Sequence, residues 1–275
     1  MIAARNLSLH YATAEGRVAI LSDISCEIAG GEFVALMGAN GSGKTSFARC
    51  LNGIIQPASG VVLVDGMDTR APEHLLEIRR RVGMVFQHPD NQMVAPTVER
   101  EIAFGLENLG VARAEMHARV EEMLERFELQ AYREHAPHQL SGGEKQRVAL
   151  AAILAMQPRH IIFDEPTSLL DHPSRVRLFE TIAQLRAAAT PSQHSPSIVL
   201  ITQFAEEALF AERLLVLHQG KLVMNGPPRE LFIHVEAFRQ IGLQPPLEFR
   251  VYHELRAKGH ARLALEELLL DPILE

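Results

Sequence analysis

Aromatic and basic side chains are scarce in this sequence. It contains no tryptophan, aromatic residues make up 5% of its 275 residues, and 27 Lys and Arg stand against 34 Asp and Glu, which gives a net charge of −7. Proteins that bind nucleic acid meet the phosphates with basic surface, and those that bind single strands stack the bases on aromatic rings. The composition therefore argues against nucleic acid as a partner.

Cysteine and long hydrophobic runs are also lacking. Cys26 and Cys50 do not have the spacing of metal ligands and cannot make a disulfide framework, so we expect both to be reduced and buried. None of the 13 histidines stands in a two-ligand spacing near a third partner, and we expect them at the surface rather than at a metal. No stretch reaches about eighteen consecutive apolar residues, the length of a membrane span. We therefore expect a soluble chain that meets a membrane only through a partner.

What the sequence does contain is an alternation of short apolar runs with longer helical patterns, which is typical of an α/β fold around a largely parallel sheet. The first two apolar runs alternate with polar residues on either side of a turn that contains glycine, so we expect an antiparallel flap outside the parallel sheet. The strands that we predict are residues 2–10, 17–26, 33–37, 60–64, 82–85, 160–163 and 197–202, followed by a hairpin of 213–217 and 221–224.

A helical pattern occupies the chain from residue 97 to residue 156. Thr97 is a good N-cap residue for the first helix, and residues 116–127 give a second helix. The apolar residues at helical spacing after Thr97 are Val98, Ile102, Leu106 and Leu109. We predict a domain over residues 1–228, with a helical subdomain, about residues 90–158, inserted between two core strands.

The pattern changes again after Pro227 and Pro228, where we predict a helical C-terminal extension over residues 229–275. Its apolar residues at helical spacing are Leu247, Val251, Leu255, Leu265, Leu268 and Leu269. Ahead of the last core strand, residues 187–197 are rich in Ala, Pro and Ser, which favours an exposed loop.

A glycine-rich loop connects one predicted strand, residues 33–37, to a helix. Glycines let the backbone wrap closely around phosphates with its N–H groups turned inward, and the helix N-terminus adds a positive dipole end. Lys44 can reach the β- and γ-phosphates, and the hydroxyl of Thr45 can bind Mg²⁺. Because strand, loop and helix follow in this order, a chance glycine-rich turn is a poor alternative. The predicted phosphate-binding residues are Gly38, Ala39, Asn40, Gly41, Ser42, Gly43, Lys44, Thr45 and Ser46.

Two carboxylates end another predicted strand, residues 160–163. Asp164 is suited to hold Mg²⁺, and Glu165 is placed to act as general base toward water. A strand that ends in Asp-Glu is by itself more often an exposed turn. The phosphate loop changes this interpretation, because the carboxyl ends of parallel strands face one crevice.

A second anion site is predicted where residues 140–147 open a helix. The hydroxyl of Ser141 and the N–H groups of Gly142 and Gly143 lie at the helix N-terminus, and Glu144 is at its third position. A simple N-cap with a capping box is the plainer interpretation and holds locally. It does not explain two glycines where better helix formers would serve.

Taken together, the phosphate loop, residues 140–146 and residues 161–171 resemble the ATP-binding-cassette (ABC) ATPases, over about residues 1–228. The resemblance implies a P-loop NTPase with a RecA-like core sheet, ATP and Mg²⁺ as ligands, and Tyr11 stacked on adenine. It further implies that Gln87 contacts Mg²⁺ and the attacking water, and that residues 168–171 cross to an opposing subunit. Two nucleotides are then sandwiched head to tail, each between one subunit's phosphate loop and the other's Ser141–Glu144 element, so a second ABC subunit is required.

One position departs from that pattern. Gln203 stands where these ATPases usually have the histidine that contacts the γ-phosphate. Glutamine keeps a hydrogen-bond donor of similar reach but cannot carry a positive charge. We expect weakened hydrolysis at this chain's own site, and we predict a pair with a related cassette that retains the histidine. A pair of two identical chains is the alternative. The predicted catalytic residues are Glu165, Gln203 and Gln87, and the predicted metal ligands are Thr45, Gln87 and Asp164.

Residues 86–92 and 95–105 resemble one group in particular, the energy-coupling-factor ATPases. This implies the ATP-hydrolysing subunit of an importer of a vitamin or a transition-metal ion, peripheral on the cytoplasmic face of a prokaryotic cell membrane. Its partners would be an integral-membrane coupling protein and a substrate-binding membrane component. We expect Asp90, Glu99 and Glu101 to meet basic residues of the membrane partner, and the C-terminal extension to contact the second ATPase.

Three alternatives remain open at this point. Instead of an energy-coupling-factor ATPase, the sequence is also compatible with a generic importer cassette, with a weakly hydrolytic partner of a related cassette, and with a soluble ABC ATPase that has no part in transport. Gln203 favours the second, whereas the presence of Glu165 argues against complete loss of hydrolysis.

Overall fold

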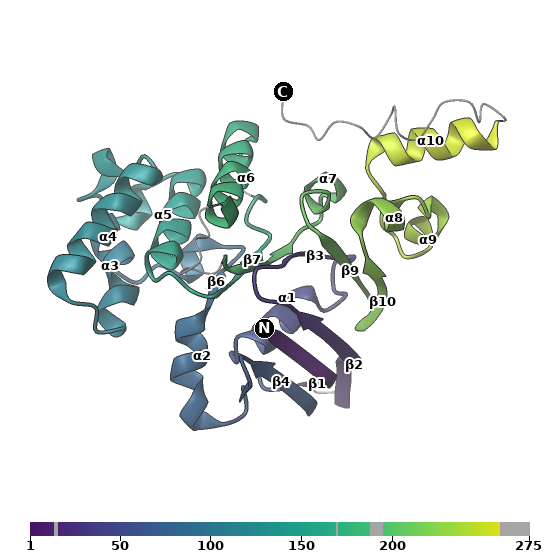
Figure 1. Cartoon of the computed structure of the whole chain (residues 1–275), viewed down its shortest axis with the longest axis horizontal. Helices are drawn as coiled ribbons and strands as arrows, with labels where there is room; N and C mark the ends of the chain where they lie inside the picture. The colour runs from purple at the N-terminus through teal and green to yellow at the C-terminus, as the bar shows by residue number, and fades with distance from the viewer. Residues whose placement is uncertain (14–15, 169, 188–194, 259–275) are drawn as a thin grey trace.

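The computed structural model describes residues 1–13, 16–168, 170–187 and 195–258 (Figure 1). The strands are β1 (Ile2–Thr13), β2 (Gly16–Ile28), β3 (Phe33–Met37), β4 (Ser59–Val64), β5 (Met67–Asp68), β6 (Val82–Val85), β7 (His160–Asp164), β8 (Ser197–Ile201), β9 (Arg213–His218) and β10 (Lys221–Gly226). The α-helices are α1 (Lys44–Leu51), α2 (Leu75–Arg81), α3 (Val98–Asn108), α4 (Arg113–Arg126), α5 (Gly142–Ala155), α6 (His172–Ala187), α7 (Ala205–Ala208), α8 (Pro228–Phe232), α9 (Val235–Gln240) and α10 (Leu247–Ala257). Short 3₁₀ helices are η1 (Pro72–His74), η2 (Pro89–Asn91), η3 (Gln130–Tyr132) and η4 (Pro137–Gln139).

A six-stranded sheet forms the centre of the molecule, in the order β10-β9-β3-β8-β7-β6. The pairs β9–β3, β3–β8, β8–β7 and β7–β6 are parallel, and β10 joins the edge antiparallel through the hairpin predicted from the sequence. Every residue of β3, β7 and β8 is buried, which explains their unbroken apolar runs, since strands inside a parallel sheet are covered on both faces. The predicted α/β fold is confirmed.

A second, antiparallel sheet has the order β2-β1-β4-β5 and lies beside the core sheet (Figure 1). It contains the predicted flap of two strands, but it is larger, because β4 and β5 belong to it as well. Gly60 lets β4 come close to β1. A Cβ atom there would lie 2.3 Å from the carbonyl oxygen of Asn6, and its φ of +78° is one that L side chains rarely adopt.

Helices α3, α4 and α5 gather at one end of the molecule, between β6 and β7 in the chain (Figure 1). The side chain of Thr97 caps α3 by accepting a hydrogen bond from the Arg100 N–H at 3.4 Å. Val98, Ile102 and Leu106 are fully buried. An inserted helical subdomain is thus present, whereas the bounds given for it and for the two domains stay predictions.

The C-terminal helices α8, α9 and α10 lie at the opposite end of the molecule from α3–α5 (Figure 1). The ring of Phe232 lies 5.1 Å from that of Phe238 and 5.6 Å from that of Phe249, and all three are buried. Leu247 and Val251 of α10 are instead 59% and 38% exposed. The predicted positions Leu265, Leu268 and Leu269 lie outside the described residues, as does most of the predicted loop 187–197.

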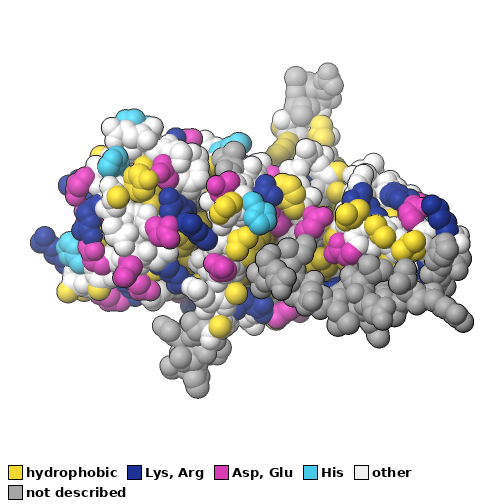
Figure 2. Space-filling model, turned by 90° about the horizontal axis from the view of Figure 1, so that it is seen from above, with side chains coloured by type: hydrophobic (Ala, Val, Ile, Leu, Met, Phe, Trp, Pro, Cys, Tyr) yellow, Lys and Arg dark blue, Asp and Glu magenta, His cyan; other side chains and the backbone are white. Residues whose placement is uncertain are grey.

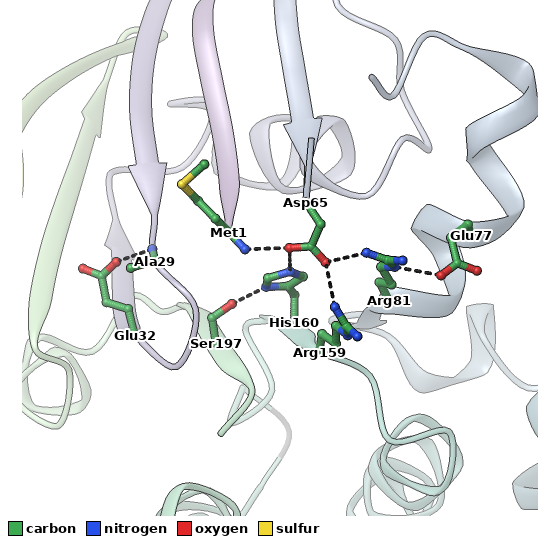
Figure 3. A network of polar contacts seen from close by, with 9 residues as sticks. All are labelled: Met1, Ala29, Glu32, Asp65, Glu77, Arg81, Arg159, His160 and Ser197. Carbon is green, nitrogen blue, oxygen red and sulfur yellow. Dashed lines mark hydrogen bonds and ion pairs between the residues drawn. The ribbon is translucent and has the colours of Figure 1, made fainter. Parts of the chain in front are cut away.

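A polar network around Asp65 joins the two sheets (Figure 3). The Asp65 carboxylate contacts the Met1 α-ammonium at 2.7 Å, Arg81 at 3.0 Å and His160 Nε2 at 3.2 Å. His160, the first residue of β7, also contacts the Ser197 hydroxyl through Nδ1. Because only 2% of His160 is exposed, the prediction of surface histidines is wrong for this one. The network lies at the end of β7 opposite to Asp164.

The remaining predictions from composition concern the two cysteines, the surface charge and membrane-spanning segments. Cys26 and Cys50 are both free and buried, and burial raises the pKa of Cys26 to about 11 and that of Cys50 to about 12. Figure 2 shows acidic and basic side chains interspersed over the helical end of the molecule on the face in view. Among the helices that the structure describes, none is long and apolar enough to cross a bilayer.

Candidate nucleotide-binding and hydrolysis site

The glycine-rich loop between β3 and α1 has the tight shape that phosphate binding requires. Gly41 and Gly43 have φ values of +77° and +103°, in the left-handed region. A Cβ atom on Gly38 would lie 2.4 Å from the carbonyl oxygen of Leu217, and one on Gly43 would lie 2.7 Å from a methyl group of Leu21. Side chains at these positions would therefore open the loop or push it away from its neighbours.

Lys44, the first residue of α1, is folded back into this loop. Its ammonium Nζ donates to the carbonyl oxygens of Gly38 at 2.8 Å and Ala39 at 3.2 Å, and only 5% of the residue is exposed. Burial lowers the pKa of Lys44, while the charges of Glu165 and Asp164 oppose that shift. The hydroxyl of Ser42 is buried and has no hydrogen-bond partner in the described part of the chain. Phosphate oxygens would give both groups stronger, charge-assisted partners.

Two oxygen groups suited to Mg²⁺ face each other beside the loop. Thr45 Oγ1 donates to Asp164 Oδ1 at 3.1 Å, and 2% of Asp164 is exposed. Burial raises the pKa of Asp164, whereas the hydrogen bond from Thr45 lowers it. A hydroxyl and a carboxylate are the kind of ligands that Mg²⁺ takes together with phosphate oxygens. These two residues therefore fit the metal, although Gln87, the third predicted ligand, contacts Glu165 instead.

One carboxylate oxygen of Glu165 accepts hydrogen bonds from two side-chain amides. Gln87 Nε2 and Gln203 Nε2 each donate to Glu165 Oε2 at 2.8 Å. The three residues follow β6, β7 and β8, which are neighbours in the sheet, so their carboxyl ends bring them together. The structure thus places the three predicted catalytic residues in one cluster.

Tyr11 lies beside the start of α1. Its hydroxyl is 3.2 Å from the hydroxyl of Ser46, and the residue is 40% exposed. Its ring is therefore within reach of a base whose phosphates lie in the loop. Stacking on adenine stays a prediction.

The predicted second anion site, at the start of α5, is an N-cap in this chain. Ser141 Oγ accepts from the Glu144 N–H at 3.4 Å, and the Ser141 N–H donates to the Glu144 carboxylate at 2.7 Å, which completes a capping box. Hydrogen bonds from Tyr132 and then from Ser141 lower the pKa of Glu144 to about 2.

The two glycines that follow Ser141 are not needed for packing within the described chain. A Cβ atom on Gly142 would meet nothing within 4 Å, and one on Gly143 would meet a methyl group of Leu170 only at 3.9 Å. The two glycines thus leave open space at the start of α5 among the described residues. Figure 1 shows α5 in the helical group, apart from α1 and its loop.

The expectation that three acidic residues face a membrane partner is wrong for Glu101, whereas for Asp90 and Glu99 it stays a prediction. Glu101 is 4% exposed, and its carboxylate accepts from the N–H groups of Val94 and Ala95 at 2.9 and 2.7 Å, so it holds the loop before α3 and cannot meet a partner. Asp90 is exposed, but it is paired with Lys145 Nζ at 2.6 Å.

Sequence reasoning missed a buried carboxylate next to the cluster. Glu207 of α7 is 6% exposed, and its Oε2 accepts from the hydroxyls of Thr167 and Thr202. No motif identifies it, because its partners come from two loops that are distant in the chain. The one available signal is an acidic residue within an apolar run that follows a strand.

Comparison with known proteins agrees with this geometry. The family described as ABC transporter matches residues 21–168. The energy-coupling factor transporter ATP-binding protein EcfA1 of Clostridium novyi is 43% identical over 98% of this chain and 95% of its own length. The cobalt import ATP-binding protein CbiO of Syntrophus aciditrophicus is 45% identical over 94% and 90%.

Solved structures give the same result. The ATP-binding cassette MJ0796, in a dimeric post-hydrolysis state bound to ADP and Pi, has a TM-score of 0.75 and 29% identity, over 83% of this chain and 99% of that chain. The cbiO1 protein of Clostridium perfringens, part of the ABC transporter complex cbiONQ, has a TM-score of 0.73 and 28% identity, over 91% and 97%. The chain therefore belongs to the ABC transporter family and is an ATPase of the energy-coupling factor type.

Proposed function

We propose that this ATPase powers the uptake of a vitamin or a transition-metal ion through separate membrane subunits. The observation that carries the proposal is the cluster at Glu165, where Gln87 and Gln203 each donate to one carboxylate oxygen at 2.8 Å. A carboxylate held in this way at the end of the phosphate crevice is placed to take a proton from water. The names of the relatives, EcfA1 and CbiO, support the class of transporter.

The chemistry assigns a separate task to each group. Lys44 leaves the loop carbonyls to bind the β- and γ-phosphates. Thr45 and Asp164 would hold Mg²⁺, which would offset charge on the phosphate oxygens. Glu165 takes the proton of the attacking water, while Gln87 and Gln203 keep its carboxylate oriented. Gln203 also offers the γ-phosphate a neutral amide donor in place of a histidine.

A second cassette completes each site. The open surface at Gly142 and Gly143 supports the approach of a nucleotide held by another chain. We propose a head-to-tail pair in which the Ser141–Glu144 element of one subunit meets the phosphate loop of the other. The exposed Leu247 and Val251 of α10 support a further contact through the C-terminal extension. The weakened donor at Gln203 favours a related chain as the partner.

Membrane subunits are proposed to dock beside Gln87, on the cytoplasmic face of a prokaryotic cell membrane. Two large apolar side chains of the segment that follows Gln87 in the chain, Val94 and Phe104, are 66% and 45% exposed. Apolar side chains exposed next to charged ones are typical of protein contacts. The integral-membrane coupling protein would contact this surface, and a separate membrane component would bind the transported substrate.

The experiment that tests the proposal replaces Lys44 by alanine in the complex purified with its membrane subunits. We expect ATP binding to weaken by about 100-fold, because a hydrogen bond between charged groups contributes roughly 1.5–3 kcal/mol, and uptake to stop. Lys221→Ala, an exposed lysine on β10, is the matched control. Normal ATP hydrolysis and uptake with Lys44→Ala would contradict the proposal.

A second candidate is a subunit that binds ATP but hydrolyses little. Gln203 is the observation that favours it. The same complex distinguishes the two, because Glu165→Gln would then leave total hydrolysis unchanged.

A further inference from the structure

Two loops meet at the catalytic cluster, and one buried carboxylate joins them. The first loop follows β7 and begins with Glu165, and its described residues are 165–168 and 170–171. The second, residues 202–204, follows β8 and contains Gln203. Glu207 lies beneath both on α7, where its Oε2 accepts from Thr167 Oγ1 of the first loop at 3.1 Å and from Thr202 Oγ1 of the second.

The hydroxyl of Thr202 fixes the backbone on both sides of Gln203. It donates to Glu207 and accepts from the Phe204 N–H at 3.0 Å. Gln203 is therefore held between two residues that are tied to the same group. Its side-chain amide reaches Glu165 at 2.8 Å from this position.

Arg175 of α6 makes a second connection between the loops. Its guanidinium carbon lies 4.3 Å from the centre of the Phe204 ring, and its Nε donates to the carbonyl oxygen of Leu170 at 3.2 Å. The positive charge of Arg175 also favours the ionised form of Glu207. Both loops are thus held by one buried carboxyl group and by one cation.

Packing alone does not explain Glu207. Burial raises the pKa of Glu207, which means that the protein disfavours its charge, while the hydrogen bonds from Thr202 and Thr167 oppose this shift. Its second oxygen, Oε1, is buried without a hydrogen-bond partner in the described residues. A leucine of similar volume would fill the space without the cost of desolvating a carboxylate.

We propose that Glu207 is a positioning residue for ATP hydrolysis, which holds Gln203 against Glu165 by joining the two loops through Thr167 and Thr202. The proposal rests on the functions proposed above for Glu165 and Gln203. Because the hydrogen bonds of Glu207 go to Thr167 and Thr202, we expect its loss to change turnover and to leave nucleotide binding intact.

Five substitutions in the assembled complex test this. Glu207→Leu removes the acceptor and keeps the volume, whereas Glu207→Gln keeps an acceptor oxygen. The exposed neighbour Glu206→Leu is the control. We expect Glu207→Leu to lower kcat at this chain's site by about tenfold, with KM for ATP and the melting temperature unchanged, and Glu207→Gln to stay within about twofold of the wild type at that site. Thr202→Val should reproduce the loss, and Thr202→Ser should retain activity, which keeps the test valid if Glu207→Leu fails to fold.

A double substitution shows whether Glu207 acts through Gln203. Once Gln203→Ala has removed the amide, Glu207→Leu should cause less than about a twofold further loss, because residues that act as a unit are not additive. Full additivity, or a wild-type kcat in both Glu207→Leu and Thr202→Val, would overturn the positioning role. Glu165→Gln in the same assay separates this failure from a failure of the proposed function. If Glu165→Gln does not slow turnover, Glu165 is not the base and both proposals fail.

Discussion

At the scale of single residues, some polar groups of the site are hydrogen-bonded within the protein, whereas others lack a strong partner and would gain one from a bound ligand. The carboxylate of Glu165 has two amide donors, whereas the hydroxyl of Ser42 has no partner in the described residues and the Lys44 ammonium is bound only to carbonyl oxygens. Phosphate binding would satisfy these last two groups. The catalytic side is therefore preorganised, and the binding side is completed by the nucleotide.

Gln203→His should raise the rate of hydrolysis at this chain's site. A protonated histidine makes a charge-assisted hydrogen bond to phosphate, roughly twice as strong as that of a neutral amide, so we expect an increase of about tenfold. The measurement is the ATPase rate of the complex as a function of pH. The added activity should decline as pH rises above about 6.5, where an ordinary histidine loses its proton. A rate at or below that of the wild type at every pH would show that Gln203 is already sufficient.

At the scale of elements, the carboxyl ends of neighbouring strands determine which site residues come into contact. Motif residues could be predicted because phosphate chemistry requires particular residue types at fixed spacing along one segment, as at Lys44 and Asp164. Glu207, His160 and Glu101 could not, since their burial and their partners depend on how distant segments pack. For the same reason β4 was predicted as a strand, but its place in the antiparallel sheet was not.

The polar network around Asp65 and His160 predicts how the stability of the fold depends on pH. Burial lowers the pKa of His160 in the folded protein. As pH falls below about 6.5, the histidine therefore becomes protonated in the unfolded chain before it does so in the folded one. The free energy of unfolding decreases over this range as a result. Burial alone would raise the pKa of Asp65, but hydrogen bonds from the Met1 α-ammonium, Arg81 and His160 lower it. The stability that Asp65 contributes is therefore present above about pH 4 and is lost at lower pH.

The substitution His160→Gln measures how much His160 contributes to this pH dependence of stability. The variant should be less stable by about 1–2 kcal/mol at pH 8, because buried hydrogen bonds are perturbed, but its stability should fall less between pH 7 and about pH 5. Urea unfolding at several pH values measures both effects, with the exposed His10→Gln as control. An unchanged slope in His160→Gln would assign the acid sensitivity to other groups.

At the scale of the whole molecule, the proposed head-to-tail pair makes this chain supply half of each site. Its phosphate loop and its Ser141–Glu144 element lie on different parts of the fold, as Figure 1 shows for α1 and α5. Asp90, close to the proposed membrane contact, is paired with Lys145, which follows that element. The ion pair thus connects the surface proposed to meet the membrane subunit with the one proposed to meet the other nucleotide.

Asp90→Arg tests whether this surface docks the membrane subunit. The substitution reverses a charge that is 70% exposed, and we expect weaker assembly with the membrane subunits or hydrolysis that no longer drives uptake. Lys145→Ala also breaks the ion pair but leaves Asp90 in place, so it should assemble normally. Co-purification of the subunits and uptake into vesicles measure the two effects. Equal defects in both variants would mean that the ion pair, and not docking, matters.

The measurement that tests the central claim most directly is the fate of ATP on Glu165→Gln. Radiolabelled ATP and Mg²⁺ are added to the assembled complex carrying this substitution, and bound nucleotide, its chemical identity and the association of the two cassettes are measured together. We predict that ATP binds as in the wild type, stays uncleaved at this chain's site and holds the cassettes in a closed pair. Cleavage of that ATP at the wild-type rate, or loss of ATP binding, would contradict the account.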